Sequence, residues 1–183
     1  RQMRPLGVGV NLQPNAVREL FDLGLGAEVL DRVGVPAQEW ALVGLNGREV
    51  YAEPRGRYAG YHWPQYAVHR GAFHMALYQA VVDRLGADAV VLGAKVTGYT
   101  QTDAGVRAQI THADGRVEDV AGALLIGAHG LHSKVRAPKH PQQPPLHWGV
   151  AIMLRRTVRP QPFRPGPSFL GLRPPPLPTL SIP

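Results

Sequence analysis

Apolar residues in the first third of the chain recur first at helical and then at extended spacing. Behind Pro14, a favourable first-turn residue, five apolar positions predict a helix: Ala16, Val17, Leu20, Phe21 and Leu23. Val29, Leu30 and Val33 form a second short stripe, which Gly34 and Pro36 end. Two extended runs, 40–43 and 48–52, flank Asn46-Gly47. Because this pair tolerates positive φ, we expect a β-hairpin.

The pattern in the middle of the chain predicts one helix followed by several strands. Phe73, Leu77, Ala80, Val81 and Leu85 mark one helical face that ends at Gly86. The runs 95–100, 106–111 and 117–120 then alternate between apolar and polar residues, which predicts a three-stranded antiparallel meander. The continuous apolar run 123–126 predicts a strand buried in a parallel sheet. The fold class is therefore α/β with an antiparallel insertion, and a ligand crevice is expected where the strands end.

Composition shifts near Pro138. Residues 137–183 carry 13 of the 18 prolines, six of the 20 Lys and Arg residues and none of the 13 acids. Prolines remove amide donors and fix φ, so they interrupt helices and central strands. We therefore expect one partial domain at 1–136. Residues 137–183 would start a second, substrate-binding domain and degenerate into a proline-rich basic tail, disordered at its end or, alternatively, a ligand for an aromatic groove.

The location of the charge bears on possible partners. The net charge of +7 falls to +1 over residues 1–136, so the excess lies in the proline-rich end and no specific nucleic-acid partner is expected. The chain has no cysteine, which excludes disulfides and thiolate metal sites. It also has no apolar run of about 18 residues, so no transmembrane segment is expected. These features fit a cytoplasmic location.

Three short segments carry candidate chemistry. Gly7 and Gly9 lie close together in segment 7–11, where the backbone can approach a ligand, although a tight turn is the simpler interpretation. Arg70 stands at the start of the predicted middle helix, where it is either an anion ligand or an ordinary exposed arginine. His129 and His132 have no neighbouring carboxylate in the sequence, so no metal site is expected.

Read together, segments 4–17, 66–71 and 125–136 resemble the group A FAD-dependent aromatic monooxygenases, the family of para-hydroxybenzoate and salicylate hydroxylases. Segments 4–17 and 66–71, together with Glu53-Pro54-Arg55-Gly56, are most similar to the phenazine-type branch, which is 5-methylphenazine-1-carboxylate monooxygenase-like. The similarity extends from about Arg4 to Met153 in the family's order and spacing.

The resemblance implies an oxidoreductase in which NAD(P)H reduces FAD, and a flavin C4a-hydroperoxide then hydroxylates a phenazine- or salicylate-like ring with dioxygen. No catalytic side chain is nominated, because the cofactor performs the chemistry. By similarity, the cofactor-binding residues are Arg4, Gly7, Val8, Gly9 and Val10 on the flavin side and Arg70 near the pyrophosphate. Val96 would contact the adenine-ribose half, and the turn of Gly127, His129 and Gly130 would serve both nucleotides.

The chain departs from the family pattern in three ways, one of which is that the sequence ends before the family's later Gly-Asp motif and before most of its substrate-covering sheet. The family opens with a strand–Gly-x-Gly-x-x-Gly–helix unit, whereas this sequence begins after it; we therefore expect an incomplete Rossmann-like FAD/NAD(P)-binding domain without its first βαβ unit. His129 also stands where the family has aspartate. The chain alone is expected to be inactive. The alternative is a non-catalytic truncated remnant that binds flavin weakly or not at all.

Overall fold

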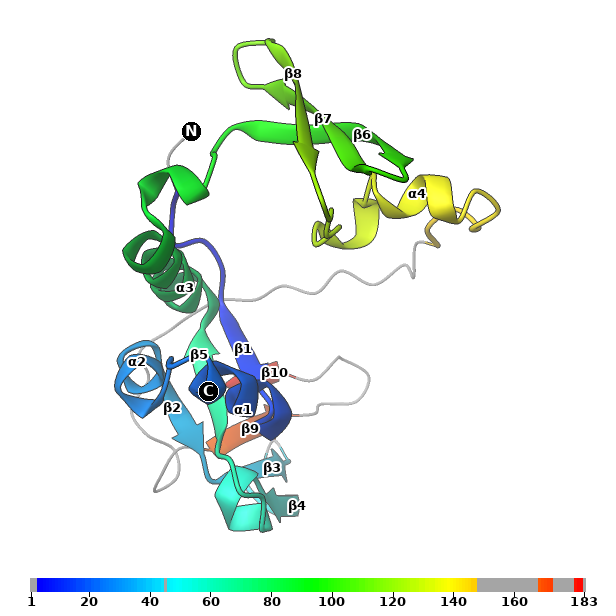
Figure 1. The fold of residues 1–183 in the computed structure, drawn as a ribbon. Coiled ribbons are helices and arrows are strands. Elements are labelled where there is room, and N and C mark those ends of the chain that lie inside the picture. The colour runs from blue at the N-terminus through cyan, green and yellow to red at the C-terminus, as the bar shows by residue number, and fades with distance from the viewer. Residues whose placement is uncertain (1–2, 45, 148–167, 173–179, 183) are drawn as a thin grey trace. The chain divides into compact units, whose positions relative to one another are not determined.

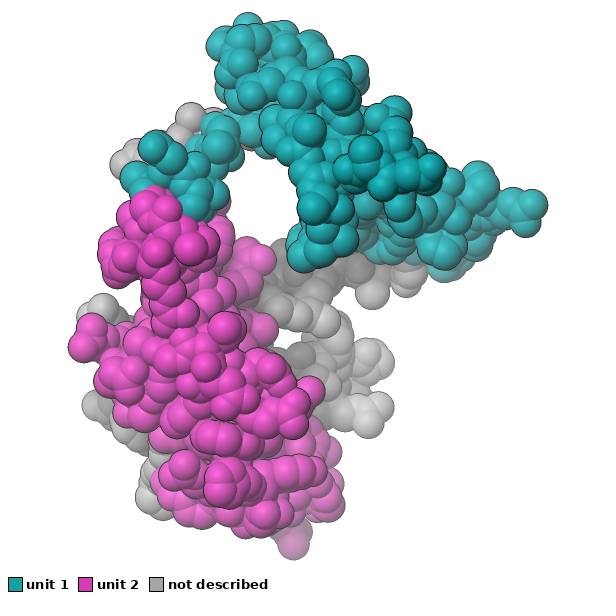
Figure 2. Space-filling model, viewed as in Figure 1, with its two compact units in different colours: residues 1–3, 87–153 teal, residues 4–86, 154–183 magenta. Residues whose placement is uncertain are grey.

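The computed structural model describes residues 3–44, 46–147, 168–172 and 180–182. The chain divides into two compact units (Figure 2): unit 1 comprises 1–3 and 87–153, and unit 2 comprises 4–86 and 154–183. Both contain helices and mainly antiparallel strands, so the α/β class is confirmed at this level. None of the described helices is long and apolar enough to cross a membrane.

The first sheet of unit 2 has the strand order β1-β5-β2, and both pairings are antiparallel. Its strands are β1 (Gly9–Leu12), β2 (Gly34–Ala37) and β5 (Gln65–His69). Three helices accompany it: α1 (Pro14–Asp22), α2 (Ala27–Val33) and α3 (Arg70–Leu85). All three predicted helices are confirmed, with Pro14 in the first turn of α1 and Gly86 directly after α3. Figure 1 shows β5 running beside β1 and leading into α3.

The core of unit 2 lies between this sheet and the first two helices. Its buried members are Val17, Leu30, Tyr66 and Val68, each 3% exposed or less. Partly buried apolar residues surround them: Leu12, Leu20, Phe21, Val33, Trp63 and Phe73. The helical stripes seen in the sequence thus face Tyr66 and Val68 of β5, whereas Ala67, which alternates to the other face of the strand, packs with Ala37 and Trp40.

The second sheet of unit 2 has the order β10-β9-β3-β4. The predicted hairpin is confirmed as β3 (Glu39–Val43) paired antiparallel with β4 (Glu49–Pro54), and Gly47 in its turn has φ 77°. A 3-10 helix, η1 (Gly56–Ala59), follows. Strand β9 (Ser168–Leu172) pairs parallel with β3, and β10 (Leu180–Ile182) pairs antiparallel with β9.

Unit 1 contains the predicted meander. Strands β6 (Ala94–Thr102), β7 (Gly105–His112) and β8 (Val117–Gly122) pair antiparallel in sequence order, which confirms it. The short helix η2 (Ala87–Ala89) precedes them. After β8 come η3 (Gly130–His132) and the single-turn helix α4 (Arg136–Lys139).

Two expectations about strands were wrong. The run 123–126 forms no strand, and Leu124 and Ile126 are 78% and 76% exposed. A parallel strand needs neighbours, and no described strand pairs with this run. Segment 7–11 is largely a strand rather than a tight turn, because β1 pairs with β5 from Gly9 onward.

The predicted boundary between 1–136 and 137–183 stays a prediction. Two strands, β9 and β10, fall within the predicted tail. The rest of that tail from residue 148 onward lies outside the described residues, so the expected disorder of the tail stays a prediction.

Candidate cofactor-binding site

The junction between β5 and α3 is the best-defined part of the candidate site. His69 caps the helix, because its Nδ1 accepts a hydrogen bond of 3.1 Å from the Ala72 N–H. The Arg70 N–H donates to the Val8 carbonyl at 2.8 Å. Two N–H groups that a helix start leaves without intrahelical partners are therefore satisfied. These bonds fix the start of α3 against the segment that leads into β1.

Two glycines allow this segment to pack directly on the helix start. Gly71 is buried, and a Cβ there would lie 2.5 Å from the carbonyl carbon of Pro5 and 2.6 Å from its oxygen. Gly7 has φ 128°, and a Cβ at this position would collide with the Arg70 guanidinium. That guanidinium also donates from Nη2 to the Leu6 carbonyl at 3.4 Å. A side chain at Gly71 would push the segment and the helix apart, whereas a side chain at Gly7 would displace the Arg70 guanidinium and would strain the backbone at its positive φ.

The resulting surface fits an anionic group. Arg70 is exposed, and no carboxylate forms an ion pair with it in the part of the chain that the structure describes. The N-terminus of the 16-residue helix α3 adds a partial positive charge at the same place. A guanidinium beside a helix N-terminus is a favourable site for a phosphate oxygen. These residues therefore fit the pyrophosphate of FAD.

Six of the ten predicted cofactor residues lie together in unit 2. Arg70 and Gly7 are in contact, and Val8 bonds to the Arg70 backbone. Gly9 and Val10 follow in β1 opposite His69 and Val68 of β5. The sixth, Arg4, is exposed, and its carbonyl accepts from the Leu6 N–H at 2.8 Å.

The other four predicted residues lie in unit 1. Val96 is half-buried in β6 and pairs with Ile110, beside an irregularity of the strand pairing. Gly127 and His129 lie between β8 and η3, Gly130 is the first residue of η3, and all three are exposed. That these four residues bind the same cofactor as the six residues of unit 2 stays a prediction.

In the turn of unit 1, close packing requires one glycine and a positive φ favours the other. A Cβ at Gly127 would lie 2.8 Å from the Cβ of Val135, which is buried, and Gly130 has φ 66°. The buried Ser133 hydroxyl accepts from the Arg136 N–H at 3.2 Å. The chain therefore winds closely around 133–135. His129 directly precedes η3, and its side chain makes no capping hydrogen bond there.

Sequence reasoning missed two groups that shape the site. His69 acts as a helix cap, although histidine is not among the usual N-cap residues. Gly71 permits the contact with Pro5, which joins positions too far apart in the sequence for local patterns to reveal. For metals, no three His, Asp or Glu side chains gather as a possible site among the residues in described positions.

Comparison with curated proteins finds several similar sequences, while no family model matches the chain. The phenazine 1,6-dicarboxylic acid hydroxylase PhzS of Lysobacter antibioticus is 44% identical over 144 residues, 78% of this chain and 35% of that protein. The aurachin C monooxygenase/isomerase of Stigmatella aurantiaca is 32% identical over 174 residues, 90% of this chain and 43% of its own length. The 3-hydroxybenzoate 6-hydroxylase 1 of Aquipseudomonas alcaligenes is 35% identical, covering 74% of this chain and 34% of that enzyme.

Two solved structures have a similar fold. FqzB is 26% identical with a TM-score of 0.56, over 78% of this chain and 31% of that chain. CtdE, solved with FAD and a substrate, shares the fold with a TM-score of 0.57 at 20% identity, over 75% of this chain and 32% of that chain. The chain spans only 34% to 43% of the length of the three curated relatives. Over this portion, the chain belongs to the family of FAD-dependent aromatic hydroxylases.

Proposed function

We propose that this chain is part of an FAD-dependent monooxygenase that uses NAD(P)H and dioxygen to hydroxylate a small aromatic or heteroaromatic ring. The similarity to a phenazine hydroxylase and to a 3-hydroxybenzoate hydroxylase supports this class of substrate. The flavin, when bound, supplies the oxygen-transfer chemistry by the route that the resemblance implies. The contribution of the residues described here is to bind and orient it.

The observation that carries the proposal is the contact of Arg70 with the segment around Gly7. The Arg70 guanidinium lies against Gly7, which has no side chain, and next to the start of α3. Its exposed donors can bind the FAD pyrophosphate while the segment from Arg4 to Val10 runs alongside the ligand. The hydrogen bond from the Arg70 N–H to Val8 keeps both parts in register.

In unit 1, the proposed contacts with the dinucleotide come from Val96 and from the turn from Gly127 to Gly130. His129 changes the number of hydrogen bonds that this turn can accept from a ligand. A carboxylate accepts hydrogen bonds from a ribose or from backbone N–H groups, whereas an imidazole offers at most one acceptor nitrogen. We therefore propose that the turn holds the dinucleotide less tightly than the family's aspartate would.

Titration of the purified chain with FAD, followed by quenching of flavin fluorescence, tests the proposal. We expect saturable binding that Arg70→Gln weakens about tenfold, because one charge-assisted hydrogen bond is lost from an exposed site. Arg32→Gln is the matched control: Arg32 is also exposed and lies in the last turn of α2. Its affinity for FAD should equal that of the parent chain.

Two results would overturn the proposal. Equal losses in both arginine variants would show that Arg70 acts only through the net charge. A folded chain that takes up no FAD would favour a non-catalytic remnant instead. Oxidation of NADH or NADPH in the presence of an aromatic carboxylate, with transfer of oxygen to the ring, would exclude that remnant.

A further inference from the structure

Positive charge accumulates after the meander of unit 1 without local compensation. The stretch 121–147 contains no aspartate or glutamate. It does contain three Lys or Arg residues and four histidines: Lys134, Arg136, Lys139, His129, His132, His140 and His147. All of these positions are described, and all lie in unit 1. Any anion that approaches this surface meets cations rather than carboxylates of the same segment.

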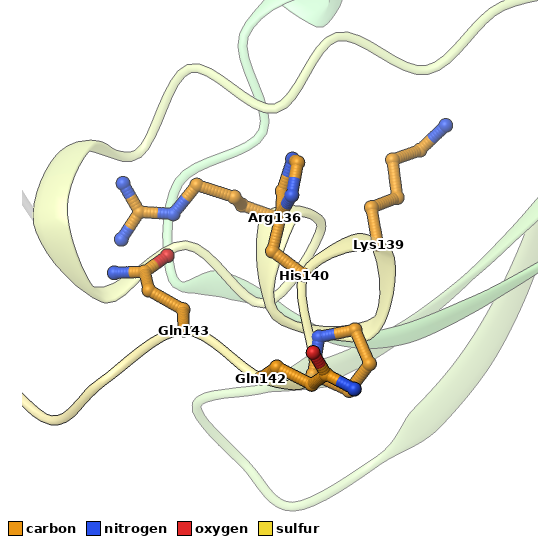
Figure 3. Close-up of a pocket in the computed structure, with 6 residues that line it drawn as sticks. Arg136, Lys139, His140, Gln142 and Gln143 are labelled. Atoms are coloured by element: carbon orange, nitrogen blue, oxygen red, sulfur yellow. The ribbon is translucent and has the colours of Figure 1, made fainter.

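Helix α4 and the residue that follows it carry three of these groups, Arg136, Lys139 and His140. Figure 3 shows the Arg136 guanidinium extending to one side of His140 and the Lys139 ammonium to the other, so the three side chains border the same region from different directions. The turn continues to His140, whose N–H donates to the Arg136 carbonyl at 3.1 Å. All three residues line one open pocket, together with Pro141, Gln142 and Gln143 from the turn that follows (Figure 3).

Hydrogen bonds within unit 1 hold the residues that line the pocket. The Arg136 guanidinium donates from Nη2 to the Leu131 carbonyl at 2.7 Å, which leaves its remaining N–H groups available. The Gln143 N–H donates to the His140 carbonyl at 3.1 Å and closes the turn. Within the described ranges, Arg136, Lys139 and His140 have no ion-pair partner. The two glutamine amides add further neutral donors.

We propose that this α4 pocket binds the phosphate or pyrophosphate group of a small ligand. A guanidinium, an ammonium and an imidazole around one hollow suit a compact tetrahedral dianion, which accepts hydrogen bonds from several directions. The pocket is distinct from the Arg70 surface of unit 2 and includes none of the ten cofactor residues predicted above. The proposal therefore does not depend on flavin binding.

Calorimetric titration of the chain with sodium pyrophosphate at low ionic strength tests this site. We expect one equivalent to bind, and Lys139→Gln to weaken binding about three- to fivefold, the upper part of the range for one exposed ionic contact. Lys134→Gln is the matched control: it removes the same charge five positions earlier, and Lys134 is exposed but does not line the pocket. It should bind pyrophosphate within about twofold of the parent chain.

A second variant distinguishes a loss of binding from local misfolding. His140→Asn keeps a polar side chain at the end of α4 and should also weaken pyrophosphate binding, with an unchanged circular dichroism spectrum. Equal losses in Lys139→Gln and Lys134→Gln would overturn the proposal, since binding would then follow net charge alone. Absence of binding to the folded parent chain, or binding that appears only with a long polyanion such as heparin, would overturn it as well.

Discussion

Tyr66 joins the buried strand β5 to helix α2, and its removal is the most informative test of the core of unit 2. The side chain is 3% exposed, and its hydroxyl donates to Asp31 Oδ1 at 2.7 Å. Tyr66→Phe removes this hydrogen bond but keeps the ring. Because Asp31 is exposed, water can solvate the carboxylate that is left behind. We therefore expect a loss of about 1–2 kcal/mol in the free energy of unfolding, the usual range for one such bond.

The pH dependence gives a second, independent measure. Burial, followed by the hydrogen bond to Asp31, raises the pKa of Tyr66 from 10.0 to about 12. Above pH 10 the unfolded chain releases this proton while the folded chain retains it. The stabilisation by Tyr66 is thus complete below pH 10 and is lost as the pH rises towards 12. A shift of this size corresponds to about 2–3 kcal/mol.

Urea unfolding followed by circular dichroism, at pH 8 and across pH 9–12, measures both effects. Tyr58→Phe is the matched control, because Tyr58 is 63% exposed and the same hydroxyl is removed. It should leave the free energy of unfolding within about 0.5 kcal/mol of the parent. If Tyr66→Phe is equally neutral and leaves the alkaline loss unchanged, the hydrogen bond between β5 and α2 does not stabilise the fold.

Three further predictions concern the helix start and the meander. Gly71→Ala should destabilise unit 2 by about 1–3 kcal/mol in urea unfolding, because its Cβ meets the Pro5 backbone. His69→Ala should cost about 1 kcal/mol in the same assay, and His69→Asn, which can still cap, should restore most of it. In unit 1, hydrogen bonds from His112 and then Arg116 lower the pKa of Glu118, so its contribution to stability is present at neutral pH and is lost as acid protonates it. His112→Ala should raise that pKa in a carbon-13 NMR titration; an unchanged value would exclude the contact.

Local patterns identified the elements that are stable for local reasons. Helices α1, α2 and α3 follow from apolar spacing, and the meander follows from alternation interrupted by glycine turns. Strand β2 was missed because it contains Pro36, but β2 is an edge strand, where a missing N–H is tolerated. Strand β1 was missed because its extended form depends on pairing with β5, more than 50 residues later.

The same limit applies to the candidate site. Arg70 was predicted at a helix N-terminus because apolar residues recur at helical spacing in the segment that follows it. Its contact with Gly7, and the approach of Gly71 to Pro5, are properties of the folded chain alone. The run from Ala123 to Ile126 shows the opposite error. Its composition suits a buried strand, but burial requires neighbouring strands that the described residues do not provide.

The strand pairings also imply an order of folding. In the meander, each strand pairs with the next one along the chain, so its hairpins close only short loops. Strand β3 forms one pair with the adjacent β4, but its other edge pairs with β9, where Glu39 meets Ser168. Non-local pairings of this kind form slowly, because the chain loses the entropy of closing a long loop before the stabilising contacts can form. During synthesis on a ribosome, the meander can therefore be complete while one edge of β3 is still unpaired, because the residues of β9 have not yet been synthesised.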